Sequence, residues 1–235
     1  SFPTRRSSDL YQLLQRWAEA DVSSAMAYAN ALKNRQEREQ AIGIVAGAWA
    51  KQDSTAAIAW IKQLPRGQLR DQILNSVLMP LSQTDPQAAL DLSQELGGAN
   101  SRRWGWGVGS IFANWATKDP LTAAAKAAEL PSGQQRSQAF QNIASAWAET
   151  DPQAAMNWAN TLSNGNDKRN AMNNILSQWA QNDVDGALAY AKQMPEGHAK
   201  NQAMSMVTQQ WAQQDPKAAM DFANTLPAGK NRPDM

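Results

Sequence analysis

Apolar and polar positions recur along this chain of 235 residues with a period of about 32 residues. Each period contains the segment Trp-Ala-x-x-Asp or a close variant, and an alanine follows the aspartate four residues later. The segment starts at Trp17, Trp49, Leu81, Trp115, Trp147, Trp179 and Trp211, and its aspartates are Asp21, Asp53, Asp85, Asp119, Asp151, Asp183 and Asp215. A fixed period of this length predicts a repeat protein in which each unit buries its apolar face against the next.

The pattern within one period predicts two helices. Asp151 is a preferred N-cap and Pro152 suits the first helical position, so a helix is expected over 152–162. In four periods this helix ends at a Leu-Pro-x-Gly segment or its Met-Pro-x-Gly variant, because proline cannot continue a helix and glycine accepts the turn. An apolar stripe at helical spacing that ends at Trp179 predicts the other helix. We name the helix that ends at the anchor tryptophan the first helix and the one opened by the aspartate the second helix.

Seven periods predict an all-α fold of about fourteen helices, arranged as a right-handed α-solenoid of antiparallel helix pairs. Over residues 11–230, treated as a single domain, the pattern resembles the tetratricopeptide class of helical-hairpin repeats. The small alanine in the second helix and the ending before proline carry the resemblance. The period of 32, the tryptophan at the end of the first helix and the missing Leu-Gly pair depart from it. The resemblance implies a scaffold that holds partners in a groove, and no functional residue transfers with it.

The two ends of the chain stand outside the repeat. Residues 1–10, SFPTRRSSDL, resemble the in-frame translation of a sequencing-adapter oligonucleotide, so we expect a non-native scar there. Residues 231–235 are expected to be a truncated C-terminal end. With the true N-terminus missing on this interpretation, the sequence does not indicate a compartment.

Charge and composition argue against several kinds of function. The chain carries 22 basic and 21 acidic residues, and without Arg5, Arg6 and Asp9 the two numbers are equal. A net charge of zero argues against nucleic-acid binding, which needs a basic surface. The chain has no cysteine and no apolar run of about 18 residues, so we expect no thiolate site, no disulfide and no membrane insertion.

Positions that are the same in every repeat must serve folding. We expect the aspartates to cap helices rather than to bind metal, the invariant alanines to let helices approach closely, and the anchor tryptophans to lie in the core. A basic residue 17 positions after most of these aspartates either caps carbonyls of the preceding second helix or forms a ladder for an acidic partner. These basic residues are Arg38, Arg70, Arg136, Lys168, Lys200 and Arg232, with Arg102 or Arg103 in the third repeat.

Catalytic chemistry finds little support in the sequence. His198 is the one histidine and lies in a polar turn. No nucleophile with a base, no metal-ligand spacing and no phosphate-binding glycine loop is present. We therefore expect no enzyme and no cofactor.

Two regions are candidates for binding a partner. The first is the variable face of the first helices, where amides and hydroxyls predominate and suit an extended peptide or a glycan better than an anion. The alternative is a polar face that only meets solvent. The candidate contact residues on this face are Asn75, Gln141, Asn142, Asn173 and Asn174.

The second candidate is the third repeat, which breaks the pattern at several positions together. Leu81 replaces the anchor tryptophan, Pro80 lies inside an expected helix, and Leu92 replaces an aromatic residue. Two extra residues enter near 97–98, before a segment that offers Arg102, Arg103, Trp104 and Trp106 as candidate contact residues. Such clustering is expected at a binding hot spot or a hinge, and drift or a packing adjustment is the alternative.

The sequence therefore predicts a non-enzymatic helical-repeat scaffold that binds a peptide or protein in its groove. One alternative is a carbohydrate-binding or cell-envelope accessory module, for which Trp104 and Trp106 would form an exposed platform. Another is a structural spacer within a larger protein. The oligomeric state is not indicated.

Overall fold

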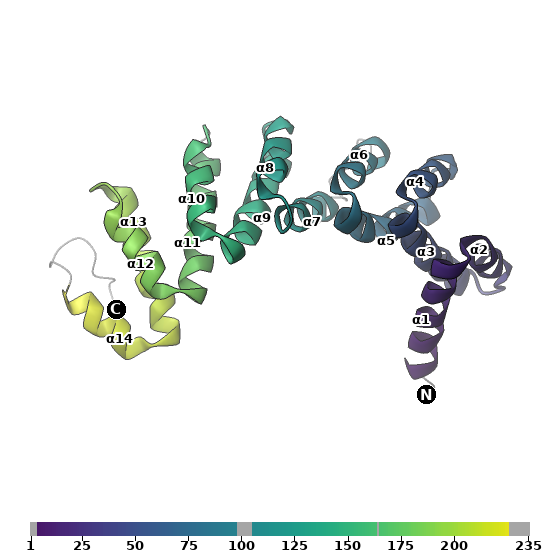
Figure 1. Cartoon of the computed structure of the whole chain (residues 1–235), viewed down its shortest axis with the longest axis horizontal. Helices are drawn as coiled ribbons and strands as arrows, with labels where there is room; N and C mark the ends of the chain where they lie inside the picture. The colour runs from purple at the N-terminus through teal and green to yellow at the C-terminus, as the bar shows by residue number, and fades with distance from the viewer. Residues whose placement is uncertain (1–3, 98–104, 164, 226–235) are drawn as a thin grey trace. The chain divides into compact units, whose positions relative to one another are not determined.

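The computed structural model describes residues 4–97, 105–163 and 165–225, and these residues form fourteen helices and no strand (Figure 1). The all-α fold class predicted from the repeat is confirmed. The helices are α1 (Thr4–Ala20), α2 (Val22–Ala31), α3 (Arg35–Gln52), α4 (Ser54–Gln63), α5 (Gln68–Thr84), α6 (Pro86–Gly97), α7 (Gly105–Ala116), α8 (Pro120–Glu129), α9 (Gln134–Thr150), α10 (Pro152–Thr161), α11 (Gly165–Asn182), α12 (Val184–Gln193), α13 (His198–Gln214) and α14 (Pro216–Thr225).

The chain divides into two compact units, Ser1–Trp115 and Ala116–Met235. In the first unit α1, α3 and α5 pack in sequence, α2 packs on α1 and α3, and α4 packs on α3 and α5. The second unit repeats this scheme with α9, α11 and α13 as neighbours and with α10 and α12 each between two of them. Each unit is thus a stack of helical hairpins with first helices in one layer and second helices in the other. A right-handed solenoid running through both units stays a prediction.

All seven repeat aspartates cap the second helices, as predicted. Each side chain accepts a hydrogen bond from the backbone N–H three residues later, at 2.9–3.0 Å. Six of them also donate their own N–H to the carbonyl of the anchor residue four positions earlier, so that one residue ends the first helix and starts the second. Proline takes the first helical position in α6, α8, α10 and α14. The repeated Asp therefore sets the tight turn of every hairpin.

At two caps a hydroxyl group holds the carboxylate in its charged form. The Ser24 hydroxyl donates to Oδ2 of Asp21 at 2.6 Å. This hydrogen bond, with help from the Ser24 backbone N–H, lowers the pKa of Asp21 below its ordinary value. Thr122 lowers the pKa of Asp119 in the same way. Hydrogen bonds to the ionised form favour that form.

The junction between hairpins uses proline and glycine. Leu64, Leu130 and Met194 are the C-caps of α4, α8 and α12, and a glycine three residues later precedes the next first helix. The three glycines have φ of 158° at Gly67 and 154° at both Gly133 and Gly197. Residues with a side chain rarely adopt this backbone conformation. The predicted helix breaks at these three sites are confirmed, whereas the fourth, Leu226-Pro227, lies outside the described residues.

Two kinds of recurring side chain fill the core. The invariant alanines of the second helices are 0–2% exposed, which fits their predicted role in close packing. In five repeats the anchor tryptophan contacts the aromatic residue eleven positions later, with ring centroids 5.4–5.8 Å apart. Trp147 and Trp179 are buried as predicted, whereas Trp17 is 41% exposed.

The third repeat keeps the same packing with smaller residues. Leu81 and Leu92 occupy the anchor and partner positions and are both buried. Pro80 lies inside α5, as expected. Opposite it, α3 carries Gly47, where an added Cβ would lie 3.0 Å from the Ser76 carbonyl oxygen. The two first helices α3 and α5 therefore approach each other closely, which agrees with a packing adjustment in this part of the third repeat.

Candidate functional site

The predicted variable face of the first helices is hollowed between α11 and α13. A depression of about 350 Å³ lies there, and an adjoining one of about 460 Å³ runs along the start of α13. Both include Met206 and Gln209. The first is lined by Asn173, Asn174, Ser177, Met206, Gln209, Gln210 and Gln213, and the second by His198, Asn201, Gln202, Ser205, Met206 and Gln209.

Five side chains of the first hollow carry amides and one carries a hydroxyl, so this surface combines neutral donors and acceptors. The structure thus places the predicted residues Asn173 and Asn174 together in one concave surface. Gln141 and Asn142 lie half-buried on α9, the first helix that packs beside α11. Asn75 is exposed on α5, in the other unit.

A hollow on the same face of the first unit has a different character. It measures about 320 Å³ between α3 and α5, and its wall includes Ile44, Met79 and Pro80 beside the two glycines of α3. Met79 is 51% exposed. The variable face is therefore amide-lined in the second unit and more apolar in the first.

The predicted hot spot of the third repeat falls largely outside the described residues. This applies to Arg102, Arg103 and Trp104 entirely, and to the side chain of Trp106, which belongs to α7. The prediction that one of the two indoles is exposed therefore stays a prediction.

The basic residues at the start of the first helices use more than one kind of partner. Arg38 donates to the Leu32 carbonyl at 3.0 Å, and Lys168 donates to the Asn160 carbonyl at 3.0 Å, so capping of the preceding second helix is confirmed at these two positions. Lys200 instead pairs with Glu196 at 2.7 Å. Arg136 instead pairs with Asp167 at 3.5 Å, and a ladder for an acidic partner stays a prediction. A nearby carboxylate is a stronger acceptor for a cation than a carbonyl.

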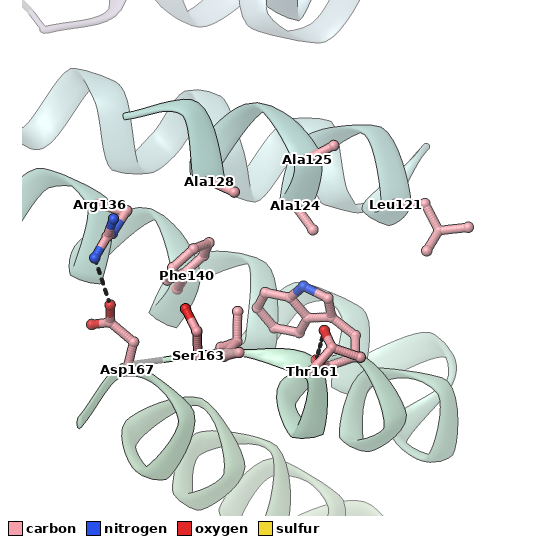
Figure 2. A pocket seen from close by; sticks show the side chains of 11 residues that line it. Leu121, Ala124, Ala125, Ala128, Arg136, Phe140, Thr161, Ser163 and Asp167 are labelled. Carbon is pink, nitrogen blue, oxygen red and sulfur yellow. Dashed lines mark hydrogen bonds and ion pairs between the residues drawn. The ribbon is translucent and has the colours of Figure 1, made fainter. Parts of the chain in front are cut away.

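A further hollow, of about 410 Å³, lies among the second helices α8 and α10 and the start of α9 and α11. We call it the α8–α10 hollow. Figure 2 shows Arg136 and Asp167 at one end, Leu121 at the other, and Phe140 between them. Its lining residues are Leu121, Ala124, Ala125, Ala128, Arg136, Phe140, Trp158, Thr161, Leu162, Ser163 and Asp167. The walls are apolar and aromatic, and most of the polarity gathers at one end.

The polar end of this hollow is buried and incompletely paired. Asp167 is 3% exposed and accepts a hydrogen bond from the Ser137 hydroxyl at 2.6 Å. Its other oxygen lies 3.5 Å from Nη2 of Arg136, at the long limit of a hydrogen bond. Nε of Arg136 is buried without a hydrogen-bond partner. An unsatisfied buried donor costs about 1–3 kcal/mol, and more when it is charged, so this arrangement lowers the stability of the second unit.

Sequence reasoning missed this hollow, although the repeats contain its signal. At the position of Ala124 the other six repeats have Met, Ile or Leu, and at the position of Ala128 they have Asn, Lys or Gln. Leu121 is the reverse case, because the other repeats have a polar residue there. Position-by-position comparison of the second helices finds all three departures, whereas the burial of Asp167 has no signature in the sequence.

Neither a metal centre nor a membrane span emerges from the described part of the chain. Within residues 4–97, 105–163 and 165–225, His, Asp and Glu side chains form no group of three that could hold a metal ion. No helix in these ranges is both long enough and apolar enough to cross a bilayer. Comparison of the chain with models of protein families, with curated proteins and with solved structures returns no match.

Proposed function

We propose that this protein is a non-enzymatic helical-repeat scaffold that binds an extended peptide segment of a partner protein along its first-helix face. The observation that supports the proposal most is the pair of adjoining hollows on α11 and α13, which are lined mainly by amide and hydroxyl side chains. An extended peptide backbone presents N–H and C=O groups in alternation, and amide side chains supply the complementary acceptor and donor together.

The charge of this surface also supports a neutral ligand. The hollow between α11 and α13 is lined by five Asn or Gln residues. Neither this hollow nor the adjoining one is lined by Lys, Arg, Asp or Glu. A peptide backbone is neutral, whereas a phosphate or a sulfated glycan would require basic residues at the site. Side chains of the partner peptide that contact Met206 would add an apolar contribution to recognition.

Selection from a displayed library of random peptides tests this function, because it needs no knowledge of the partner. We expect enrichment of a shared motif and a measurable Kd for the synthetic peptide by calorimetry. Replacing Asn173 and Asn174 together by alanine should weaken binding about tenfold or more, the equivalent of one or two lost hydrogen bonds. The matched control replaces Gln153 and Asn157, exposed amides on α10, and should leave the Kd unchanged.

Two results would contradict the proposal: no enriched motif, or a peptide whose Kd is insensitive to the Asn173 and Asn174 replacements. A glycan array probed with the same protein addresses the carbohydrate-binding alternative. If the protein binds a glycan and the joint replacement of Asn173 and Asn174 abolishes that binding, the site is a carbohydrate-binding site.

A further inference from the structure

The outer face of α8 differs in sequence from the same face of every other second helix, and it borders the α8–α10 hollow. We propose that this face is an interface between two copies of the chain, in which the two α8 helices pack antiparallel across a twofold axis. Leu121 of each copy enters the hollow of the other beside Ala128 and Phe140. The interface lies on second helices, so it is independent of the proposed peptide groove on the first helices.

Leu121 is exposed at a position where the other repeats are polar. Its side chain is 68% exposed, the largest value for a large apolar side chain among the described residues. Burial of such a side chain in a complex removes apolar surface from water and stabilises the complex. The residues at this position in the other six repeats are Ser23, Thr55, Gln87, Gln153, Asp185 and Lys217.

The apolar face continues from Leu121 along α8 as a stripe of small residues. Ala125 and Ala128 are exposed and line the hollow together with Leu121 and Ala124 (Figure 2). At the position of Ala128 the other six repeats have Asn, Lys or Gln, so α8 is the one second helix that is apolar at all three exposed positions. Helices pack by placing large side chains of one helix into the gaps beside small side chains of the other.

The occupant is a second copy because α8 carries both halves of this contact. In an antiparallel pair whose axis passes between Ala124 and Ala125, position 121 of one copy lies opposite position 128 of the other. The axis therefore brings each exposed leucine to the hollow of the other copy, and the same contact forms twice. Phe140 and Trp158 give that hollow an apolar wall against which a leucine side chain packs.

The charges at the ends of α8 are complementary in the same arrangement. Lys118 precedes the helix and Glu129 is its last residue, so Lys118 of one copy comes beside Glu129 of the other at each end of the interface. The side chain of Glu129 is 65% exposed, and it reaches the start of the other α8, where the helix dipole favours an anion. Parallel packing would instead bring like charges together.

The size of the interface sets the expected affinity. α8 has ten residues, which correspond to a length of about 15 Å. An interface built around one such helix pair buries less than about 1,200 Å², at the small end of specific interfaces. We therefore expect a reversible dimer with a Kd on the order of 100 μM.

Sedimentation equilibrium of the full chain at concentrations up to about 1 mM measures this Kd. Leu121→Gln introduces the residue that the third and fifth repeats have at this position and should weaken the dimer about tenfold or more. The matched control is Leu13→Gln, because Leu13 is 63% exposed but lies on α1, and it should leave the Kd unchanged. A chain that stays monomeric over this range, or equal effects of the two replacements, overturns the proposal.

A single introduced cysteine tests the antiparallel register, because the chain has no cysteine of its own. Ala125→Cys places two thiols beside the twofold axis, so mild oxidation should link the two copies by a disulfide. The matched control is Asn157→Cys, which changes the exposed residue at the same position of α10 and should form the link about tenfold more slowly or not at all. Equal rates for the two variants overturn the contact between the α8 helices.

The role of the hollow is tested by filling it in the Ala125→Cys variant. Ala128→Asn introduces the residue that the first and fifth repeats have at this position and should slow the disulfide link about tenfold or more. An unchanged rate in the folded variant overturns the entry of Leu121 into the hollow, and if this variant fails to fold, Leu121→Gln decides. None of these replacements lies on the first-helix face that binds the proposed peptide, so failure of the peptide groove leaves the results unaffected.

Discussion

The stability of the second unit should depend strongly on Trp147. This side chain is 5% exposed and contacts Trp158 at a centroid distance of 5.8 Å. A buried tryptophan removes about 150–250 Å² from water, which at about 25 cal/mol per Å² corresponds to roughly 4–6 kcal/mol. Core replacements of this kind cost about 3–5 kcal/mol. We therefore expect Trp147→Ala to lower the free energy of unfolding by about 4 kcal/mol.

Trp17 provides a matched control, because it occupies the same repeat position and contacts Tyr28 at 5.4 Å. It is 41% exposed, so Trp17→Ala should cost only about 2.5 kcal/mol by the same area argument. Urea unfolding followed by far-ultraviolet circular dichroism measures both values without relying on tryptophan fluorescence. Equal losses for the two variants would refute the assignment of Trp147 to the core.

Amide hydrogen exchange shows which helices lose stability in the Trp147→Ala variant. In a stack of repeats each unit contacts its neighbours, so a lost anchor opens adjacent helices before distant ones. Trp147→Ala should therefore speed amide exchange first in α9, α10 and α11 and only later in α3 and α5. A uniform rise in exchange over the whole chain would contradict nearest-neighbour stability.

Three further outcomes follow from the turns and the caps. Gly133→Ala should cost about 1–3 kcal/mol, since φ of 154° is strained for alanine, and a chemical melt gives the value. Gly47→Ala should also destabilise, despite its better helix propensity, because the new Cβ meets the Ser76 carbonyl at 3.0 Å; a raised melting temperature would contradict the close approach. Ser24→Ala should raise the pKa of Asp21 in an NMR titration. The Ser24 hydrogen bond lowers that pKa, so its stabilising effect is present above the unfolded-state pKa and is lost as the pH falls through the folded value.

The periodic part of the sequence predicted the fold well, because each repeated residue acts locally. Asp151 caps the helix that follows it, and Gly133 ends a turn; neither role depends on residues of other repeats. The burial of Trp147 followed from its recurrence at one position. The structural role of a residue can be predicted from spacing alone when the residue contacts others within about ten positions in the sequence.

Contacts between repeats were predicted less well. Arg136 and Asp167 are 31 residues apart and meet only because α9 and α11 pack side by side. Nothing in the spacing distinguishes Arg136 from Arg38, which caps a carbonyl instead. The choice of partner depends on which acceptor the next repeat presents, so a single repeat does not contain this information.

Departures from the repeat separate into two kinds once packing is known. In the third repeat Leu81 and Leu92 are both smaller than the residues they replace and both are buried, and α3 and α5 approach each other closely at Gly47. In the fourth repeat Ala124 and Ala128 lose volume, and a hollow remains beside them although Phe140, which also lines it, is larger than its counterparts in the other repeats. Buried replacements that leave the core closed require only that the fold be kept. A loss of volume that leaves a hollow lowers stability, and it is retained most readily where another requirement outweighs the lost contacts.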